Sequence, residues 1–366
     1  MIMPIFPLKK VKLVVSDFHL GKGRRLSDGS QNLLEDFRSD RQFVDFLDYY
    51  MKGPYKRCDV ELILNGDFFN LLQVDYRDQF TDFITEADSL HKLRSILLGH
   101  EALFKKMSEF SRESHHSLIF VLGNHDPGLL WEGVQEALRE FLGGDVKFEM
   151  KSYRSDGIHV EHGNQYQIDN RYNYDRLFLT KNLPEPIINL PFGSFLCVHY
   201  LHEIKKERPY FDKVYPFSLY LRWALFHDTW FALKSTFKLV VWFLKFILTP
   251  NPARKLTFMQ VIGILGQASI HPKIHNDAKR ILFAEEECRI VVFGHTHQHR
   301  HIQFKPGKDY FNSGTWNERI SLEVGSLGRV LNHTFVQIDF DKAGIPRGAL
   351  KEWRGHIDVV EDLSFL

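Results

Sequence analysis

Short apolar runs that give way abruptly to polar residues mark the first half of the chain and recur near its end. Residues 11–15, 61–64, 118–122, 158–160 and 290–293 form such runs, and a loop containing Asp, Asn, His or Gly follows each. A run of this length, bounded by polar turn residues, predicts a buried β-strand that opens into a loop. The pattern therefore predicts five strands, each with a polar loop at its carboxyl end.

Longer segments between the first three strands have a helical spacing of apolar residues. Residues 33–50 and 90–110 place apolar side chains mainly three or four positions apart, which predicts amphipathic helices. Alternating strands and helices predict a layered α/β core. Because ligands in open α/β sheets gather outside the carboxyl ends of the strands, we expect the five polar loops to converge on one site.

Residues 170–285 differ in character from the rest of the chain. Aromatic and leucine side chains crowd residues 210–248, and prolines punctuate the segment. Proline and glycine are the strongest local breaks in regular structure. We therefore predict a core formed by residues 1–169 and 286–366, and a largely helical insertion over residues 170–285.

The composition narrows the class of protein. The chain is 44% hydrophobic and 25% charged, as in ordinary globular proteins and unlike disordered or fibrous ones. Its 47 Lys and Arg balance 46 Asp and Glu, so no general attraction to nucleic acid is expected. Three widely spaced cysteines form neither a disulfide framework nor a CxxC metal site. The N-terminus also lacks a signal-peptide pattern, and we expect a cytoplasmic protein.

The polar loops carry side chains that bind metal ions. Any one motif also fits a structural role, since an Asp can cap a helix and Asp67 can be a turn residue. Imidazole and carboxylate together suit Mn, Fe, Zn, Co or Ni better than calcium. The donors are too many for one tetrahedral ion and fit two divalent ions. They are Asp17 and His19 in D-x-H, Asp67 in N-G-D, Asn124 in G-N-H-D, and His295 and His297 in G-H-T-H.

The order of these motifs resembles the calcineurin-like metallophosphoesterase superfamily, over about residues 10–162 and 285–340. The resemblance implies a layered β-sandwich flanked by helices and two divalent ions, with manganese favoured. It also implies that His125 is catalytic and that Asp126 is its carboxylate partner. One ion would be held by Asp17, His19, Asp67 and His297, and the other by Asp67, Asn124, a lone histidine and His295, with Asp67 bridging.

The lone histidine is either His162, in E-H-G-N-Q, or His199, in C-V-H-Y. A histidine followed by Gly and Asn resembles the bacterial branch that includes UDP-2,3-diacylglucosamine diphosphatases, so we select His162. We expect His199 to lie beside a packed apolar face. That branch typically has Arg where this chain has His125, which leaves the choice between a monoester, a diester and a pyrophosphate open. The turn at residues 312–316 also resembles the family, in a structural role.

The donor set predicts metal-dependent hydrolysis of a phosphoester or pyrophosphate bond, with a metal-bridging hydroxide as nucleophile. His125, polarised by Asp126, would stabilise or protonate the leaving oxygen. A non-catalytic protein-binding scaffold of the same fold is one alternative, but it is expected to have lost ligands. A nuclease-type phosphodiesterase is another, but it is expected to have a basic surface.

Residues 229–248 have the most unusual composition in the chain. Their length suits a membrane span, but Lys234, Lys238 and Lys245 interrupt them, at a high cost near a bilayer centre. An amphipathic helix is expected instead. Its apolar face either packs on the core, or residues 216–248 meet the inner face of a membrane or accept a lipid. The expected substrate is accordingly a phosphorylated small molecule or a lipid-linked one.

Overall fold

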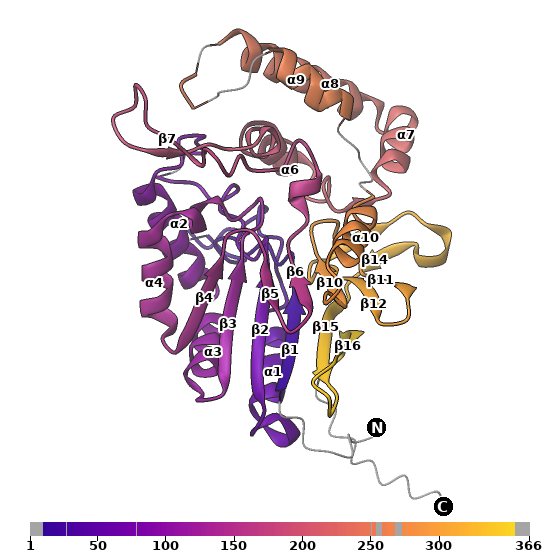
Figure 1. The fold of residues 1–366 in the computed structure, drawn as a ribbon. Coiled ribbons are helices and arrows are strands. Elements are labelled where there is room, and N and C mark those ends of the chain that lie inside the picture. The colour runs from indigo at the N-terminus through magenta and orange to yellow at the C-terminus, as the bar shows by residue number, and fades with distance from the viewer. Residues whose placement is uncertain are drawn as a thin grey trace, which may run out of the picture.

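Two β-sheets form the centre of the computed structural model, which describes residues 10–26, 28–77, 79–249, 251–253, 258–267 and 273–355. The larger sheet has six strands in the order β16-β15-β1-β2-β3-β4 (Figure 1). Strands β1 to β4 run parallel, and β15 and β16 add an antiparallel edge. The bounds are β1 Lys10–Val15, β2 Asp59–Asn65, β3 His116–Val121, β4 Asp145–Glu149, β15 His333–Phe340 and β16 Pro346–Trp353.

The second sheet has five strands in the order β11-β12-β10-β6-β5. Its strand β10 runs parallel to both β6 and β12. Buried side chains of the two sheets, among them Val14, Ile63, Val160 and Val292, meet in one apolar cluster. The sheets therefore pack face to face as a sandwich. The bounds are β5 Tyr153–Ser155, β6 Ile158–Val160, β10 Ile290–Phe293, β11 Arg300–Lys305 and β12 Lys308–Asn312.

Helices cover the outer face of each sheet, which gives four layers. The larger sheet packs against α1 Asp40–Met51, α2 Glu86–Gly99, α3 Glu101–Arg112 and α4 Glu132–Leu142. The smaller sheet packs against α10 His275–Ala284 through Ala278 and Leu282. The predicted layered α/β sandwich is confirmed, and so are all five predicted strands. Short 3₁₀ turns lie at Gly53–Tyr55, Pro127–Leu130, Asn164–Tyr166 and Val324–Ser326.

Two predicted helices differ in their extent. The helix expected over residues 33–50 begins only at Asp40, and the one expected over 90–110 is two helices separated at His100. The buried ring of His100 lies 2.6 Å from Asp40 and 3.4 Å from Glu35. Glu35 also accepts backbone hydrogen bonds from Gly21 and Gly23. These long-range polar contacts end the helices where the apolar periodicity alone would continue them.

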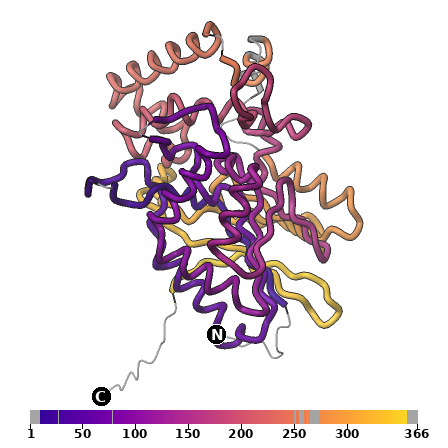
Figure 2. Tube along the Cα trace, turned by 90° about the vertical axis from the view of Figure 1, so that its left-hand side faces the viewer, coloured from indigo at the N-terminus to yellow at the C-terminus, as the bar shows by residue number. Residues whose placement is uncertain are grey.

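The insertion covers the carboxyl ends of the core strands. In both Figure 1 and Figure 2, α8 lies at the end of the molecule opposite the beginning of β1. No helix among the described residues is both long and apolar enough to cross a membrane. The elements are β7 Phe178–Leu179, β8 Ile187–Ile188, α5 Phe192–Leu196, a π-helical turn η4 Cys197–Leu201, α6 His202–Glu207, β9 Val214–Tyr215, α7 Phe217–His227, α8 Thr229–Leu248 and α9 Phe258–Gln267.

The expected end of the insertion at residue 285 lies too far along the chain. Helix α10 packs on the core sheet, so the core resumes before residue 286. The apolar residues of α10 would fit a helix of the insertion equally well, so composition alone does not separate the two. A small sheet of β9, β13 Arg319–Ser321 and β14 Gly328–Val330 further links the insertion to the C-terminal part.

A buried ion network fastens the insertion to the core. The fully buried Lys205 of α6 donates to Asp36 of the core at 2.7 Å and lies 3.0 Å from Asp212. Lys213 contacts the other oxygen of Asp36 at 2.9 Å. Because a buried charge without its partner is costly, this network fixes the insertion above the strand ends.

Candidate metal centre

Five loops at the carboxyl ends of the strands bring the predicted metal ligands together. Asp17 and His19 follow β1, Asp67 follows β2, Asn124 follows β3, His162 follows β6, and His295 and His297 follow β10. Their donor atoms, together with those of His125, form three overlapping groups of the kind that holds a metal ion. The first group is Asp17, His19 and His297, the second is Asp67, His162 and His295, and the third is His19, Asp67 and His125.

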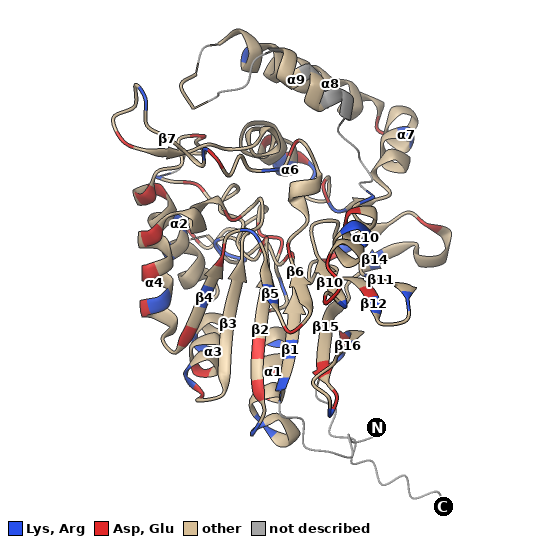
Figure 3. Cartoon of the chain, in the orientation of Figure 1, with Lys and Arg blue, Asp and Glu red and all other residues tan. Residues whose placement is uncertain are grey.

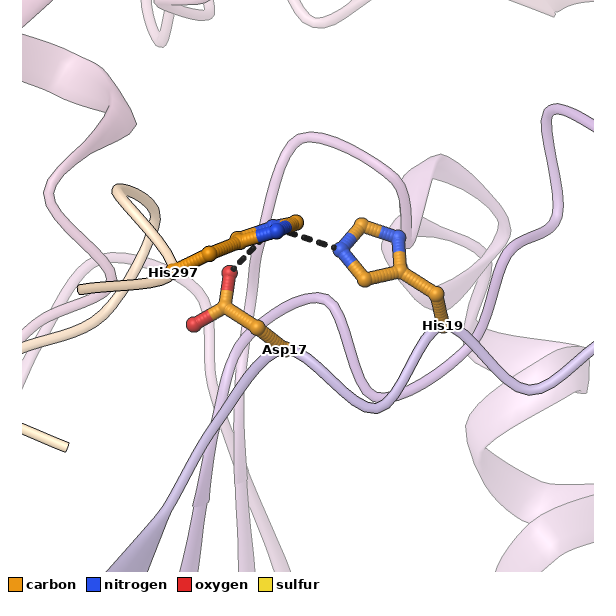
Figure 4. Close-up of side chains that lie close together, drawn as sticks. All are labelled: Asp17, His19 and His297. Carbon is orange, nitrogen blue, oxygen red and sulfur yellow. Dashed lines mark hydrogen bonds and ion pairs between the residues drawn. The ribbon is translucent and has the colours of Figure 1, made fainter. Parts of the chain in front are cut away.

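The first group surrounds one point in space (Figure 4). The Nε2 atom of His297 lies 3.3 Å from an Asp17 oxygen and 3.1 Å from the Nε2 atom of His19. Asp67 closes the group, since its carboxylate lies 3.7 Å from His19. Two imidazole nitrogens and two carboxylates aimed at one another form a donor set that suits a divalent transition metal.

Asp67 connects the second group to the first, because the third group places it beside His19. The Nε2 atom of His162 lies 3.1 Å from Asp67 and 4.0 Å from Asp17. The Oδ1 atom of Asn124 is buried and has no hydrogen-bond partner within the described residues, which is unfavourable unless a further ligand meets it. His295 completes the group, with its Nε2 atom 2.6 Å from Gln167 Oε1. The residues present therefore fit a second cation beside the first.

The charges at the site also suit cations. Burial lowers the pKa of His19 and of His295 to about 3, so both rings are neutral, as a ligand must be. Burial opposes the charge on His162 as well, but Asp67 and Asp17 outweigh it and raise its pKa to about 10. The carboxylates thus attract a proton to His162, and a divalent cation would take the place of that proton.

The ligand loops have an unusual backbone. Asp17, His19, Asp67, His295 and His297 all have positive φ angles, between 50° and 67°. For residues other than glycine this conformation is uncommon and costs about 1–3 kcal/mol each, and it persists only where the surroundings impose it. Backbone hydrogen bonds do so here: His19 donates to the carbonyl of Asp67 at 2.9 Å, and His295 donates to the Asp17 carboxylate at 3.0 Å.

Two glycines allow the loops to approach each other. A Cβ atom on Gly66 would lie 2.4 Å from the His162 ring, and one on Gly123 would lie 2.2 Å from the Asp67 amide nitrogen. Gly66 also has a φ of 76°. His162 is further oriented because its Nδ1 lies 2.8 Å from the carbonyl of Asn65. Such a contact fixes which ring nitrogen faces the ligand.

The turn at residues 312–316 holds two of the ligand loops in place through hydrogen bonds. Asn312 donates to the carbonyl of Gly294 at 2.7 Å, and the Thr315 hydroxyl donates to the carbonyl of Asp17 at 2.6 Å. Trp316 is buried among the aromatic rings of Phe18, Phe43 and Phe46. The turn thus ties the D-x-H and G-H-T-H loops to the core, in the structural role expected for it.

The expected pair of His125 and Asp126 is wrong. Both Asp126 oxygens accept backbone hydrogen bonds instead, from Phe69 at 2.8 Å and Gly123 at 3.1 Å, and burial raises its pKa to about 8. His125 Nδ1 lies 3.0 Å from the Oδ1 atom of Asn70. Adjacent side chains in the G-N-H-D turn diverge, so Asp126 holds the loop while Asn70 orients the histidine.

A cavity of about 750 Å³ opens above the metal ligands. Core residues such as His125 and His297 line one side of it, and Leu201, Val214 and Tyr215 of the insertion line another. Arg319 also lines it, and within the described residues its guanidinium makes no hydrogen bond or ion pair. Lys273 and Arg300 add two further cationic side chains to the wall. Carboxylates such as Asp169, Asp212 and Glu318 line the cavity as well, so its wall carries charges of both signs.

His199 lies apart from the metal ligands. It belongs to the π-helical turn η4 and contacts Asp82 at 3.2 Å. Three residues at the site were not predicted: Asn70, Gln167 and Arg319. None of them follows an apolar run or belongs to a spaced motif, and only the unusual density of polar residues after His162 could have drawn attention to Gln167.

A family model described as calcineurin-like phosphoesterase matches residues 12–299. The chain belongs to the calcineurin-like phosphoesterase family. Members of this family are metal-dependent phosphoesterases, in agreement with the candidate donor groups that meet at Asp67 and His19. The match is to the family as a whole and not to the branch of UDP-2,3-diacylglucosamine diphosphatases.

Individual proteins show less similarity to this chain than the family model does. Among solved structures, the chain is similar to a dimetal phosphatase from Danio rerio, with 8% sequence identity and a TM-score of 0.37, over 94% of this chain and 99% of that one. No curated protein sequence matches. The family assignment therefore rests on the match over residues 12–299 and on the site itself.

Proposed function

We propose that this phosphoesterase uses two divalent metal ions to hydrolyse a phosphoester or pyrophosphate bond. The observation that carries the proposal is the pair of donor groups on one cavity, joined by the buried Asp67. Asp17, His19, Asp67 and His297 would hold one ion, and Asp67, Asn124, His162 and His295 the other. We propose manganese as the preferred ion, since oxygen and imidazole donors suit it.

Bound ions would supply positive charge that activates a water molecule and neutralises the phosphoryl oxygens. The chain supplies the rest. Asp17 and Asp67 have pKa values below the usual range because neighbouring histidines outweigh the effect of burial, so both stay ionised. His125 directs Nδ1 to Asn70, and when protonated it carries a hydrogen on Nε2. That hydrogen is available to the oxygen of the leaving group.

The cavity supports a substrate larger than a single phosphate. Its volume of about 750 Å³ is in the range of pockets that enclose drug-sized ligands. Arg319 lines this cavity, and a guanidinium is suited to bidentate binding of phosphate oxygens. We propose a phosphorylated small molecule or a lipid-linked phosphate as substrate, with the insertion deciding which compounds reach the ions.

A hydrolysis panel tests this function. The full chain, loaded with Mn²⁺, is assayed on a phosphomonoester, a phosphodiester, a nucleotide-sugar pyrophosphate and DNA, each also with a chelator. We expect chelator-sensitive release of product from at least one of the first three compounds. The Asp67→Ala variant serves as the inactive control. Absence of metal-dependent turnover on every substrate would favour a non-catalytic scaffold, and turnover of DNA alone would favour a nuclease.

A further inference from the structure

Helices α7 and α8 expose an unusual number of large apolar side chains. More than half of the exposed large apolar side chains in the described part of the chain lie within residues 219–248. Phe226 is 81% exposed, Trp230 79% and Phe237 69%. Contiguous apolar surface of this kind marks an interaction site on a folded protein. We call these exposed side chains of α7 and α8 the outer face.

Helix α8 carries apolar side chains on both its inner and its outer side. Its Lys234 is exposed and its Lys238 half-buried, and both pair with Glu207 of α6 at 2.8–3.0 Å. Its outer side carries apolar residues three or four positions apart, the spacing of one helical face. These are Trp230, Leu233, Phe237, Val240, Leu244 and Leu248. Other apolar residues of the same helix, Phe231 and Phe246, are buried on its inner side, so α8 packs on the domain and also exposes an apolar stripe.

The helix is attached to the domain along its length. Phe231 and Phe246 are buried on its inner side, and Phe246 packs against Phe192 and Phe195 of α5. Trp242 also contacts Phe192. An element held in this way along one side presents only its other side to a partner, so α8 would lie on a surface rather than cross it.

The charges around the outer face complement an anionic surface. Arg222 and Lys245 are exposed, and within the described residues neither forms a hydrogen bond or ion pair. The only acidic residue between positions 217 and 253 is Asp228, and Arg208 neutralises it at 3.0 Å. Figure 3 shows how few charged positions α7 and α8 carry in comparison with α4. Exposed tryptophan and phenylalanine beside isolated lysines and arginines are typical of helices that lie in a bilayer interface.

We propose that the outer face of α7 and α8 docks onto a bilayer containing anionic lipid, with Phe226, Trp230 and Phe237 inserted at the headgroup level. A second copy of the chain would bring Arg222 and Lys245 of both copies to the same apolar patch, which like charges oppose. An acidic lipid surface pairs them instead. The docking is independent of the hydrolytic chemistry, because no outer-face residue lines the metal cavity.

Sedimentation with vesicles tests the docking. The full chain is mixed with vesicles of phosphatidylcholine alone or with added phosphatidylglycerol, at low and high salt. We expect binding to the phosphatidylglycerol vesicles that weakens as salt rises. The variant Phe226→Ser, Trp230→Ser, Phe237→Ser should bind at least about tenfold more weakly, since all three side chains lose apolar contact with lipid.

The matched control replaces equally exposed apolar residues elsewhere. Leu98, Val324 and Leu327 are 77%, 99% and 73% exposed, and changing all three to Ser should leave vesicle binding unchanged. If the outer-face variant does not fold, Trp230→Ser alone is compared with Leu98→Ser. A wild-type chain that stays in solution with both kinds of vesicle would overturn the proposal, and so would equal binding by both variants. A dimer at micromolar concentration that the outer-face variant converts to a monomer would assign the face to a second copy instead.

Discussion

The proposed proton transfer depends on the contact between His125 and Asn70. His125→Ala removes the ring but none of the metal ligands, so metal content should stay unchanged while kcat falls about 10²–10⁴-fold. Asn70→Ala should lower kcat with little effect on KM, and Asn70→Asp, which keeps an acceptor oxygen, should restore part of the rate. Steady-state kinetics and elemental analysis measure both. Loss of metal from His125→Ala would instead make His125 a ligand, in line with its position near His19 and Asp67.

Arg319 lines the cavity in which we propose that the substrate binds. Because hydrogen bonds to charged groups contribute about 1.5–3 kcal/mol, Arg319→Ala should raise KM about 10–100-fold and change kcat less, with Arg319→Lys intermediate. The control is Arg329→Ala, since Arg329 is exposed on the neighbouring strand β14 and pairs with Glu318. Equal KM values for the two alanine variants would show that Arg319 does not touch the substrate.

The residues of the candidate site differ in how well their positions can be predicted from the sequence. The metal ligands follow apolar runs, so the ends of the predicted strands point directly to them. Asn70 follows the same strand as Asp67 but three residues further on, where its direction depends on the path of the loop. The expected pairing of His125 with Asp126 is wrong for the same reason. Neighbours in sequence need not face each other, and backbone amides of Phe69 and Gly123 compete for the carboxylate.

At the scale of the elements, His100 links the α2–α3 junction to the loop after Asp17 and His19. Burial would lower its pKa, but Asp40 and Glu35 outweigh this effect and raise it to about 9, compared with 6.5 in the unfolded chain. The folded state therefore binds the proton more tightly. This contribution is complete below pH 6.5 and is lost as pH rises through 9. It amounts to about 3 kcal/mol, at about 1.4 kcal/mol per pKa unit.

Denaturant unfolding at pH 6.5 and pH 9 measures the effect. The free energy of unfolding of the wild type should fall by about 3 kcal/mol more over this interval than that of His100→Gln, which has no titrating ring. The difference between the two proteins cancels other groups that titrate in both. An equal pH dependence would mean that the contacts of His100 with Asp40 and Glu35 do not persist in solution.

Strands are better predicted than helices in this chain. Each predicted strand is mostly apolar and followed by polar residues, so local sequence largely defines it. Helix limits depend on contacts distant in sequence, as His100 shows, and the placement of α10 depends on which sheet its apolar face meets. The sequence also left open which side of α8 is buried. In the structure both sides of α8 carry aromatic residues, since Phe231 and Phe246 are buried while Trp230 and Phe237 are exposed.

At the scale of the whole molecule, the proposed hydrolytic site and the segment proposed to control substrate entry lie in different parts of the chain. The sandwich holds the metal ligands, while the insertion, fastened by Lys205 to Asp36, forms a wall of the cavity and carries the outer face. The division of the chain into a core and an insertion is a reasonable prediction from composition. The position of the insertion relative to the core is not predictable from the sequence. It depends on the buried Lys205, which sequence alone would place on the surface.

The account depends most on two ions that share Asp67, and elemental analysis of the folded, manganese-loaded chain tests this directly. We predict about two ions per wild-type chain, loss of both from Asp67→Ala because it removes the shared ligand, and a weakened hold on chiefly one ion in Asp17→Ala. Circular dichroism confirms that each protein is folded. One ion or none in the folded wild type, or two ions retained by Asp67→Ala, would contradict the dinuclear site.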